Sequence, residues 1–228
     1  MTKNVFVFYF LLVLINSSLA QTDSLKIKTA KKIIGINVNG LGYRGDLGQG
    51  FDKWGNGIGI SIKFNKKKKF NSEFETYFGS IYGQDPTLEP IQDPTIKTVS
   101  EITPVKYFKT TIFSFNYQLN YNFIKTKHWI LSISQGLGLM KYTVRNESDE
   151  DLFDKISTRT KGESYNSISL ILPTTLSTTY LFNNNYGINF NLGYINPNTD
   201  YLDNISKIGK RKGNDQILKI GFKFLIPL

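Results

Sequence analysis

The chain has 228 residues, no cysteine, a formal net charge of +10 and a mean hydropathy of −0.24. These values argue against a protein with several membrane-spanning helices, each of which needs about 20 consecutive apolar residues. They also exclude disulfide scaffolds and Cys-ligated metal sites. The 17 Phe and 13 Tyr argue against a disordered chain, because disordered chains contain few aromatic residues.

The N-terminus has the pattern of a secretory signal peptide. Lys3 precedes an uninterrupted apolar run at positions 5–15, and Ser-Leu-Ala at positions 18–20 fits the small-x-small cleavage rule. As a helix rising ~1.5 Å per residue, the run is too short to span a bilayer, so an uncleaved membrane anchor is the less favoured alternative. We therefore predict a signal peptide at 1–20 and one exported domain at 21–228.

Downstream of the signal peptide, eight segments alternate between apolar residues and small polar ones. This alternation with a period of two predicts β-strands. The segments are residues 32–43, 54–65, 70–82, 107–124, 129–143, 167–182, 186–195 and 216–228. In the fourth segment, for example, Phe113, Phe115 and Tyr117 alternate with Ser114 and Asn116.

The connections between these segments alternate between long and short. The long ones are residues 44–53, 83–106, 144–166 and 196–215, and the short ones are 66–69, 125–128 and 183–185. This pattern is typical of an up-and-down barrel with tight turns at one rim and long loops at the other. An even number of strands places both termini at the rim with the short turns.

The two faces of the predicted strands differ in a way that favours a membrane barrel. The outer face of a secreted soluble barrel would be rich in charged residues. Here one face is mostly Gly, Asn, Ser and Gln, which suit a narrow lumen, and the other is bulky and apolar, which suits lipid. Aromatic residues near the strand ends are expected in interfacial girdles: Trp54, Phe64, Phe70, Tyr82, Tyr107, Phe123, Trp129, Tyr142, Phe182, Tyr186 and Tyr194. We predict an all-β, eight-stranded antiparallel up-and-down transmembrane β-barrel.

Three residues fit this pattern poorly. Gln135 falls on the face assigned to lipid, and Pro173 lies inside a predicted strand, where it removes a ladder hydrogen bond. We expect a bulge or a local break at Pro173. Lys141 has the parity of the lipid face but lies near the loop end, where it can extend toward the headgroups.

The last segment carries a family resemblance. Lys219, Gly221, Phe224 and Ile226 match the polar-x-Gly-x-x-apolar-x-apolar pattern of C-terminal strands in outer-membrane barrels, although Pro227-Leu228 replaces the usual terminal Phe. The mature chain resembles the small eight-stranded outer-membrane proteins, with OmpA/OmpX-like architecture and a Bacteroidetes-type character. The resemblance implies recognition of the last strand by the barrel-assembly machinery. It also implies location in the cell outer membrane, with both termini periplasmic, and transfers no functional residue.

Charged residues on the small-residue face predict an ion-pair network inside the barrel. The candidates are Lys63, Glu73, Glu75, Lys219 and Lys223. Buried charges need partners, and the last strand must pair with the first for the barrel to close. The network would either plug the lumen or gate it for small ions. Plugging is favoured, because eight strands enclose little free cross-section.

Catalytic and cofactor chemistry find little support in the sequence. A lipid-modifying barrel enzyme would need a His–Ser pair, but His128, the only histidine, falls in a predicted short turn away from Ser132 and Ser134, which face the lumen. A single histidine makes a His-based metal site improbable, and we expect no cofactor. The lysine-rich turn at 66–69 suits anionic headgroups better than nucleic acid, because the chain is exported.

The long loops are the remaining place for function. Glu147, Asp149, Glu150, Asp151 and Asp154 form an acidic cluster that could bind Ca²⁺, but it lacks an EF-hand framework, so a solvated loop is favoured. Four basic residues of the last loop could contact lipopolysaccharide phosphates or the acidic loop: Lys207, Lys210, Arg211 and Lys212. We predict a non-enzymatic barrel with a structural or surface-interaction role and an unidentified surface partner. The alternatives are a lipid-modifying barrel enzyme and a secreted soluble ligand-binding barrel.

Overall fold

The computed structural model describes most of the region predicted to form the exported domain. The described residues are 32–48, 50–64, 69–87, 91–92, 101–102, 105–155, 167–205 and 213–228. The predicted signal peptide at 1–20 and the basic loop residues Lys207, Lys210, Arg211 and Lys212 lie outside these ranges. Within them, no helix is long and apolar enough to cross a membrane.

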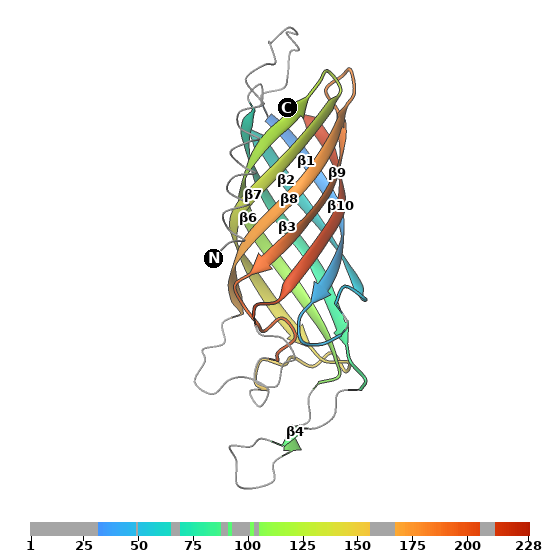
Figure 1. Ribbon diagram of the computed structural model, residues 1–228, viewed down its shortest axis with the longest axis vertical. Helices are drawn as coiled ribbons and strands as arrows, with labels where there is room; N and C mark the ends of the chain where they lie inside the picture. Colours follow the sequence, from blue (N-terminus) through green and yellow to red (C-terminus); the bar gives the residue numbers. More distant parts are fainter. Residues whose placement is uncertain are drawn as a thin grey trace, which may run out of the picture.

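Eight long strands form a closed barrel (Figure 1). They are β1 (Lys32–Arg44), β2 (Trp54–Phe64), β3 (Phe70–Gln84), β6 (Tyr107–Lys125), β7 (Trp129–Arg145), β8 (Ile168–Leu181), β9 (Gly187–Pro197) and β10 (Gln216–Pro227). Their order around the barrel is β1-β10-β9-β8-β7-β6-β3-β2, and every neighbouring pair is antiparallel. The predicted eight-stranded antiparallel barrel is therefore confirmed.

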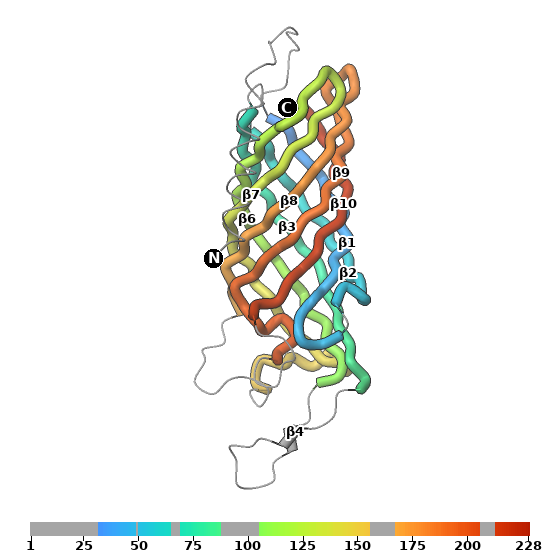
Figure 2. The backbone as a smooth tube through the Cα atoms, in the orientation of Figure 1, coloured from blue at the N-terminus to red at the C-terminus, as the bar shows by residue number. Residues whose placement is uncertain are grey.

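The turns from β6 to β7 and from β8 to β9 lie at the same end of the barrel as the C-terminus (Figure 2). The described parts of the long connections, such as the one from β1 to β2, lie at the opposite end. A feature not anticipated from the sequence is a pair of two-residue strands in the connection from β3 to β6. These are β4 (Ile91–Gln92) and β5 (Glu101–Ile102), which pair with each other in a separate sheet.

Side chains alternate between the two sides of the wall as the period-two pattern predicts. On β1 and β2 the outward Val38 and Ile58 are 60% and 63% exposed, whereas the inward Asn37 and Ser61 are 0% and 2% exposed. Strands with this alternation pack in a barrel with one apolar face and one polar face. Here the apolar face is the outer surface, which excludes the arrangement of a soluble barrel with an apolar interior.

Pro173 interrupts the ladder between β7 and β8 without a bulge. Pairing stops after Gln135↔Thr174 and resumes in the same register at Gly138↔Ile171. The side chain of Gln135 occupies this gap: its amide donates to the Pro173 carbonyl at 3.2 Å and accepts a hydrogen bond from the Thr174 hydroxyl at 2.8 Å. The predicted local break is present, and the outward Gln135 bonds to the polar groups beside it.

The bulge in the wall lies elsewhere. The register between β6 and β7 shifts between Asn122 and Ile124, close to the short-turn end. An extra residue of this kind bends a strand and increases its twist, and no turn residue in this stretch of the sequence predicts it.

An apolar cluster fills the loop end of the barrel, where small polar residues were expected on the inward face. Its members come from the strand ends and from the loops: Leu41, Tyr43, Leu47, Tyr77, Ile81, Phe108, Ile112, Met140, Tyr142, Val144, Leu152, Ile171, Ile195, Tyr201, Leu202, Ile205 and Ile217. Tyr142, expected in an interfacial girdle, is instead 1% exposed inside this mouth cluster. Tyr142 lies at an inward-facing position in the alternation of β7, so its side chain enters the barrel mouth instead of facing the membrane interface.

Small residues on the inner face are required by close backbone contacts. A Cβ atom at Gly138 would lie 2.7 Å from the Asn116 Cα and would also overlap the Phe115 carbonyl oxygen.

We predict that Gly138→Ala lowers the free energy of unfolding by about 1–3 kcal/mol, measured by urea titration of the folded protein in micelles. Gly40→Ala is the control, because its Cβ would meet Trp54 at an ordinary 3.4 Å. Equal stability of the two variants would contradict the prediction.

Candidate functional site

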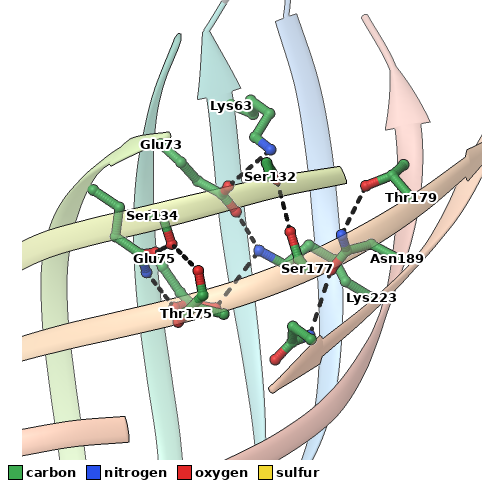
Figure 3. Close-up of polar contacts among 12 residues, drawn as sticks. Lys63, Glu73, Glu75, Ser132, Ser134, Thr175, Ser177, Thr179, Asn189 and Lys223 are labelled. Carbon is green, nitrogen blue, oxygen red and sulfur yellow. Dashed lines mark hydrogen bonds and ion pairs between the residues drawn. The ribbon is translucent and has the colours of Figure 1, made fainter. Parts of the chain in front are cut away.

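The structure brings together all five charged residues predicted to face the lumen. Lys63 and Glu73 are direct cross-strand partners on β2 and β3, and the Lys63 Nζ lies 3.5 Å from Glu73 Oε2. Lys223 of β10 reaches across the lumen to ion-pair with the other oxygen of Glu73. Figure 3 shows Lys63 and Lys223 converging on this carboxylate.

Glu75 is the second centre of the lumenal charge network. Its Oε2 accepts hydrogen bonds from the Lys219 Nζ at 3.1 Å and from the Gln118 amide at 2.9 Å. Its Oε1 accepts a hydrogen bond from the Asn37 amide at 2.6 Å and lies 3.7 Å from the Lys223 Nζ. The buried carboxylate is thus surrounded by donors from three different strands, β1, β6 and β10, and of these β6 and β10 lie on opposite sides of the wall.

The charge network leaves almost no free space at its level. The cavity lined by the network and its polar neighbours has a volume of about 20 Å³, which is room for roughly one water molecule. Three lysines face two glutamates there, so the layer carries a formal excess of one positive charge.

Uncharged hydrogen bonds continue across the lumen beside the charged layer. The Ser132 and Ser177 hydroxyls lie 2.9 Å apart, and the Asn189 amide donates to the Thr179 hydroxyl at 2.7 Å. These contacts are visible around Lys223 in Figure 3. They connect β7, β8 and β9 through their inward side chains, as the small-residue face predicts.

A wider cavity of about 110 Å³ opens at the short-turn end. Lys63, Lys125, Lys127 and His128 contribute to its lining together with apolar side chains. His128 Nδ1 lies 2.9 Å from the Leu181 carbonyl oxygen, and its ring stacks on Tyr180. The cavity has a basic side but no acidic side chain in its described lining.

Among the described residues, the structure does not bring together the His–Ser pair that a lipid-modifying barrel enzyme would need. The His128 ring bonds to a backbone carbonyl in the short-turn region, whereas Ser132 bonds to Ser177 and Ser134 donates to Gln118 inside the lumen. Within the described ranges, no group of three or more His, Cys, Asp or Glu side chains could hold a metal ion.

Two buried carboxyl groups meet at one tyrosine in the mouth cluster, a feature that sequence reasoning missed. The Tyr43 hydroxyl lies 2.8 Å from a carboxyl oxygen of Asp203 and 2.8 Å from one of Asp215. Asp203 also accepts hydrogen bonds from the Leu47 and Ile205 amides, at 3.1 and 2.9 Å. These bonds tie the loop before β10 to the loop after β1 and hold both over the barrel mouth. We call these two loops, with Tyr43, Asp203 and Asp215 between them, the cap.

Burial changes the protonation of this carboxyl pair. It raises the pKa of Asp203 to about 7 and raises the pKa of Asp215 well above its ordinary value, with the neighbouring Asp203 charge as a further cause. The Asp46 and Asp200 carboxylates oppose ionisation of Asp203 and Asp215 respectively. Since the Tyr43 hydroxyl has one proton, its second close carboxyl contact requires a proton on that carboxyl. The cap therefore retains at least one carboxyl proton near neutral pH.

The residues predicted as an assembly signal occupy both faces of β10. Lys219 and Gly221 face the lumen, Gly221 where a Cβ would overlap the Asn39 side chain. Phe224 is exposed on the outer face, and Ile226 pairs with Ile34 of β1. This strand closes the barrel.

A closed eight-stranded antiparallel barrel with an apolar exterior and a polar, charged interior is the fold of the small outer-membrane β-barrel proteins. Solved structures with this fold include neisserial surface protein A, with a TM-score of 0.53 at 10% identity over 87% of this chain and 98% of that one. Ail of Yersinia pestis gives 0.47 at 10% identity, over 87% and 99%. The outer-membrane enzyme PagL gives 0.38 at 12% identity, over 86% and 99%. No family model and no curated protein matches the sequence.

The lumenal network gives a prediction for stability. Glu75→Gln removes the charge opposite Lys219, whose side chain is 6% exposed. We expect the free energy of unfolding to fall by about 3–5 kcal/mol, because a buried charge loses its partner. Adding Lys219→Met should recover much of the loss. The control is Asp149→Asn, since the exposed pair with Arg145 contributes about 0–1 kcal/mol. A loss in Glu75→Gln as small as in the control would contradict the prediction.

The cap gives a prediction for pH dependence. Carboxyl groups of an unfolded loop ionise at a pH of ~4, whereas burial raises the pKa of Asp203 in the folded cap to about 7. Between these two pH values the folded cap binds more protons than the unfolded one. Its stability is therefore greatest at low pH and falls as the pH rises through this window. Hydrogen exchange of the Leu202 and Ile205 amides, corrected for the intrinsic rate, should accelerate accordingly.

The matched variants separate this effect from general pH sensitivity. Asp203→Asn combined with Asp215→Asn should flatten the profile, whereas Asp154→Asn, which alters an exposed carboxyl on another loop, should leave it unchanged. A flat corrected profile in the unmodified protein would show that the carboxyl pair does not control the cap.

Proposed function

We propose that the chain is a non-enzymatic outer-membrane β-barrel protein whose role is structural or lies in interactions at its loop-bearing surface. The observation that carries this proposal is the outer surface of the barrel. Bulky apolar side chains cover it on all eight strands, including Ile60, Phe115, Leu139 and Leu176, each more than half exposed. In water such a surface would aggregate, and in a bilayer it contacts acyl chains.

The interior supports a structural role. Glu73 and Glu75 are held by three lysines in a layer with little free volume, so the lumen is better suited to stiffening the wall than to transport. A gate for small ions is the second candidate, because the network is made of ionisable groups that could separate. The enzyme alternative is disfavoured because, among the described residues, His128 is not paired with Ser132 or Ser134.

Export and assembly complete the proposal. The predicted signal peptide at 1–20 would direct the chain out of the cytoplasm, and the barrel-assembly machinery would read Lys219, Gly221, Phe224 and Ile226 in β10. Both termini would then be periplasmic and the long loops extracellular. Lys207, Lys210, Arg211 and Lys212 stay a prediction for contacts with lipopolysaccharide or with an unidentified surface partner.

Membrane insertion is tested by extraction. The full chain, expressed with its signal peptide in a Gram-negative host, should sediment with the outer membrane and require detergent for release. Unheated samples should run faster on a denaturing gel than boiled ones, because a closed barrel resists the detergent. Recovery in the soluble periplasmic fraction without detergent would refute the proposal.

Conductance distinguishes a plug from a gate. We expect no resolved channel steps from the purified protein in planar bilayers, and no increase in Glu73→Gln or Glu75→Gln, because the remaining side chains still fill the cross-section. Conductance that rises in either variant would instead support the gate. Folding of each variant is checked first by heat-shifted gel mobility.

A further inference from the structure

The outer wall is not apolar everywhere: at the loop end of β3, β6 and β7 it carries a patch of basic and hydroxyl side chains. The strand register aligns these residues in three rows. They are Tyr82–Lys109–Arg145 nearest the loops, then Ser80–Thr111–Thr143, then Phe78–Phe113–Lys141. All have outward parity, so the polar rows stand directly above the apolar belt.

Like charges lie unusually close in this patch. Lys109 and Arg145 are direct cross-strand partners, which places their Cβ atoms about 4.5–5.5 Å apart and is unfavourable for two cations. Arg145 bonds Asp149 at 2.9 Å, but this ion pair is exposed. In the part of the chain that the structure describes, Lys109 and Lys141 have no acidic partner, and the exposed Glu147 lies on the adjoining loop. An anion bound between the cations would relieve their repulsion.

The spacing of the charges fits a ligand with two anionic ends. Lys141 lies four residues from Arg145 on β7, which is about 14 Å at ~3.4 Å per residue. Between these two positions the wall presents the hydroxyls of Ser80, Thr111 and Thr143. A row of hydroxyl groups flanked by cations suits a sugar with a phosphate at each end, since phosphates bind cations and sugar hydroxyls bond to Ser and Thr.

The height of the patch on the wall matches the edge of a bilayer. From Trp129, at the short-turn end of β7, to Lys141 the strand runs about 40 Å at ~3.4 Å per residue, or about 30 Å along a membrane normal at a tilt of ~40°. An apolar band of about 25 Å then ends just below Lys141. Phe113, beside Lys141, is 52% exposed and available to acyl chains.

Among the described strand residues, these basic and hydroxyl rows occupy one side of the barrel. On β8, next to Lys141, the outward residues Ile168 and Leu170 are apolar. Arg44 is exposed on the outer wall at the same end of the barrel, but it belongs to β1, which lies on the opposite side from β7. A general attraction to anionic lipid would not require the basic residues to gather on one side of the barrel.

We propose that the loop-end outer face of β3, β6 and β7 binds the headgroup of a bisphosphorylated disaccharide lipid of the lipid A class, an inference that rests on the proposed outer-membrane orientation. Lys109 and Arg145 contact one phosphate and Lys141 contacts the other. The hydroxyl row of Ser80, Thr111 and Thr143 faces the sugars, and the acyl chains lie on the apolar belt below.

The test is a binding titration with the full mature chain in detergent. Fluorescent bisphosphorylated lipid A in mixed micelles is titrated with the unmodified protein and with the double variant Lys109→Gln/Lys141→Gln. We expect the double variant to bind at least tenfold more weakly, because both positions that carry an unshared positive charge become neutral. Lys109→Arg/Lys141→Arg keeps both charges and should retain binding.

The controls decide between this site and a general anion effect. Arg44→Gln removes an outward charge at the same rim on the opposite side and should leave the affinity unchanged. Dephosphorylated lipid A and phosphatidylglycerol should bind more weakly than bisphosphorylated lipid A, and inorganic phosphate should not compete at equal concentration. Equal binding of phosphatidylglycerol, or equal affinity of the double variant and the Arg44 variant, would overturn the inference. Gel mobility and extraction report membrane insertion separately, so a barrel that inserts but shows no such selectivity refutes this site alone.

Discussion

Closure of the ladder between the first and last strands is the constraint on which the rest of the molecule depends. β1 and β10 pair from Ile33↔Pro227 to Arg44↔Gln216, so no strand keeps an unpaired edge. In a bilayer an open edge would leave backbone groups without partners, at a cost of several kcal/mol each. Once the sheet is closed, each inward side chain must fit a narrow lumen and each outward one must meet lipid. The period-two alternation along every strand is the consequence.

The lumen shows how this constraint determines chemistry. Eight strands enclose too little volume to hydrate charged groups, so Glu73 and Glu75 are ionised only with Lys63, Lys219 and Lys223 around them. The ion pairs join β3 to β2 and to β10, and the Asn37 amide adds a hydrogen bond from β1, so the contacts reach both strands of the closing seam. The ends and the outer wall are therefore the surfaces that remain accessible to a partner.

The two ends and the outer wall differ in what they offer a partner. The loop end is filled from inside by the mouth cluster, where the Tyr43 hydroxyl lies within hydrogen-bond distance of both Asp203 and Asp215. The short-turn end is open and partly basic around His128. On the outer wall, the basic rows around Lys109 and Lys141 interrupt an otherwise apolar surface. These features lie on the periphery of the barrel, where the proposed interactions at the cell surface would take place.

The sequence by itself determined the strand number, the alternation of loop lengths, which face is apolar and the Lys63–Glu73 pair, because these follow from a period of two and from neighbours in one hairpin. It also indicated that Pro173 breaks the ladder, but not that Gln135 would bond across the break. The contacts of the cap could not be predicted from the sequence, because Tyr43 and Asp203 are 160 residues apart and loops have no periodic pattern. The outer rows of Lys109 and Arg145 were equally hidden. Only the tertiary structure decided these contacts, because cross-strand register and loop docking depend on packing between residues that are distant in the chain.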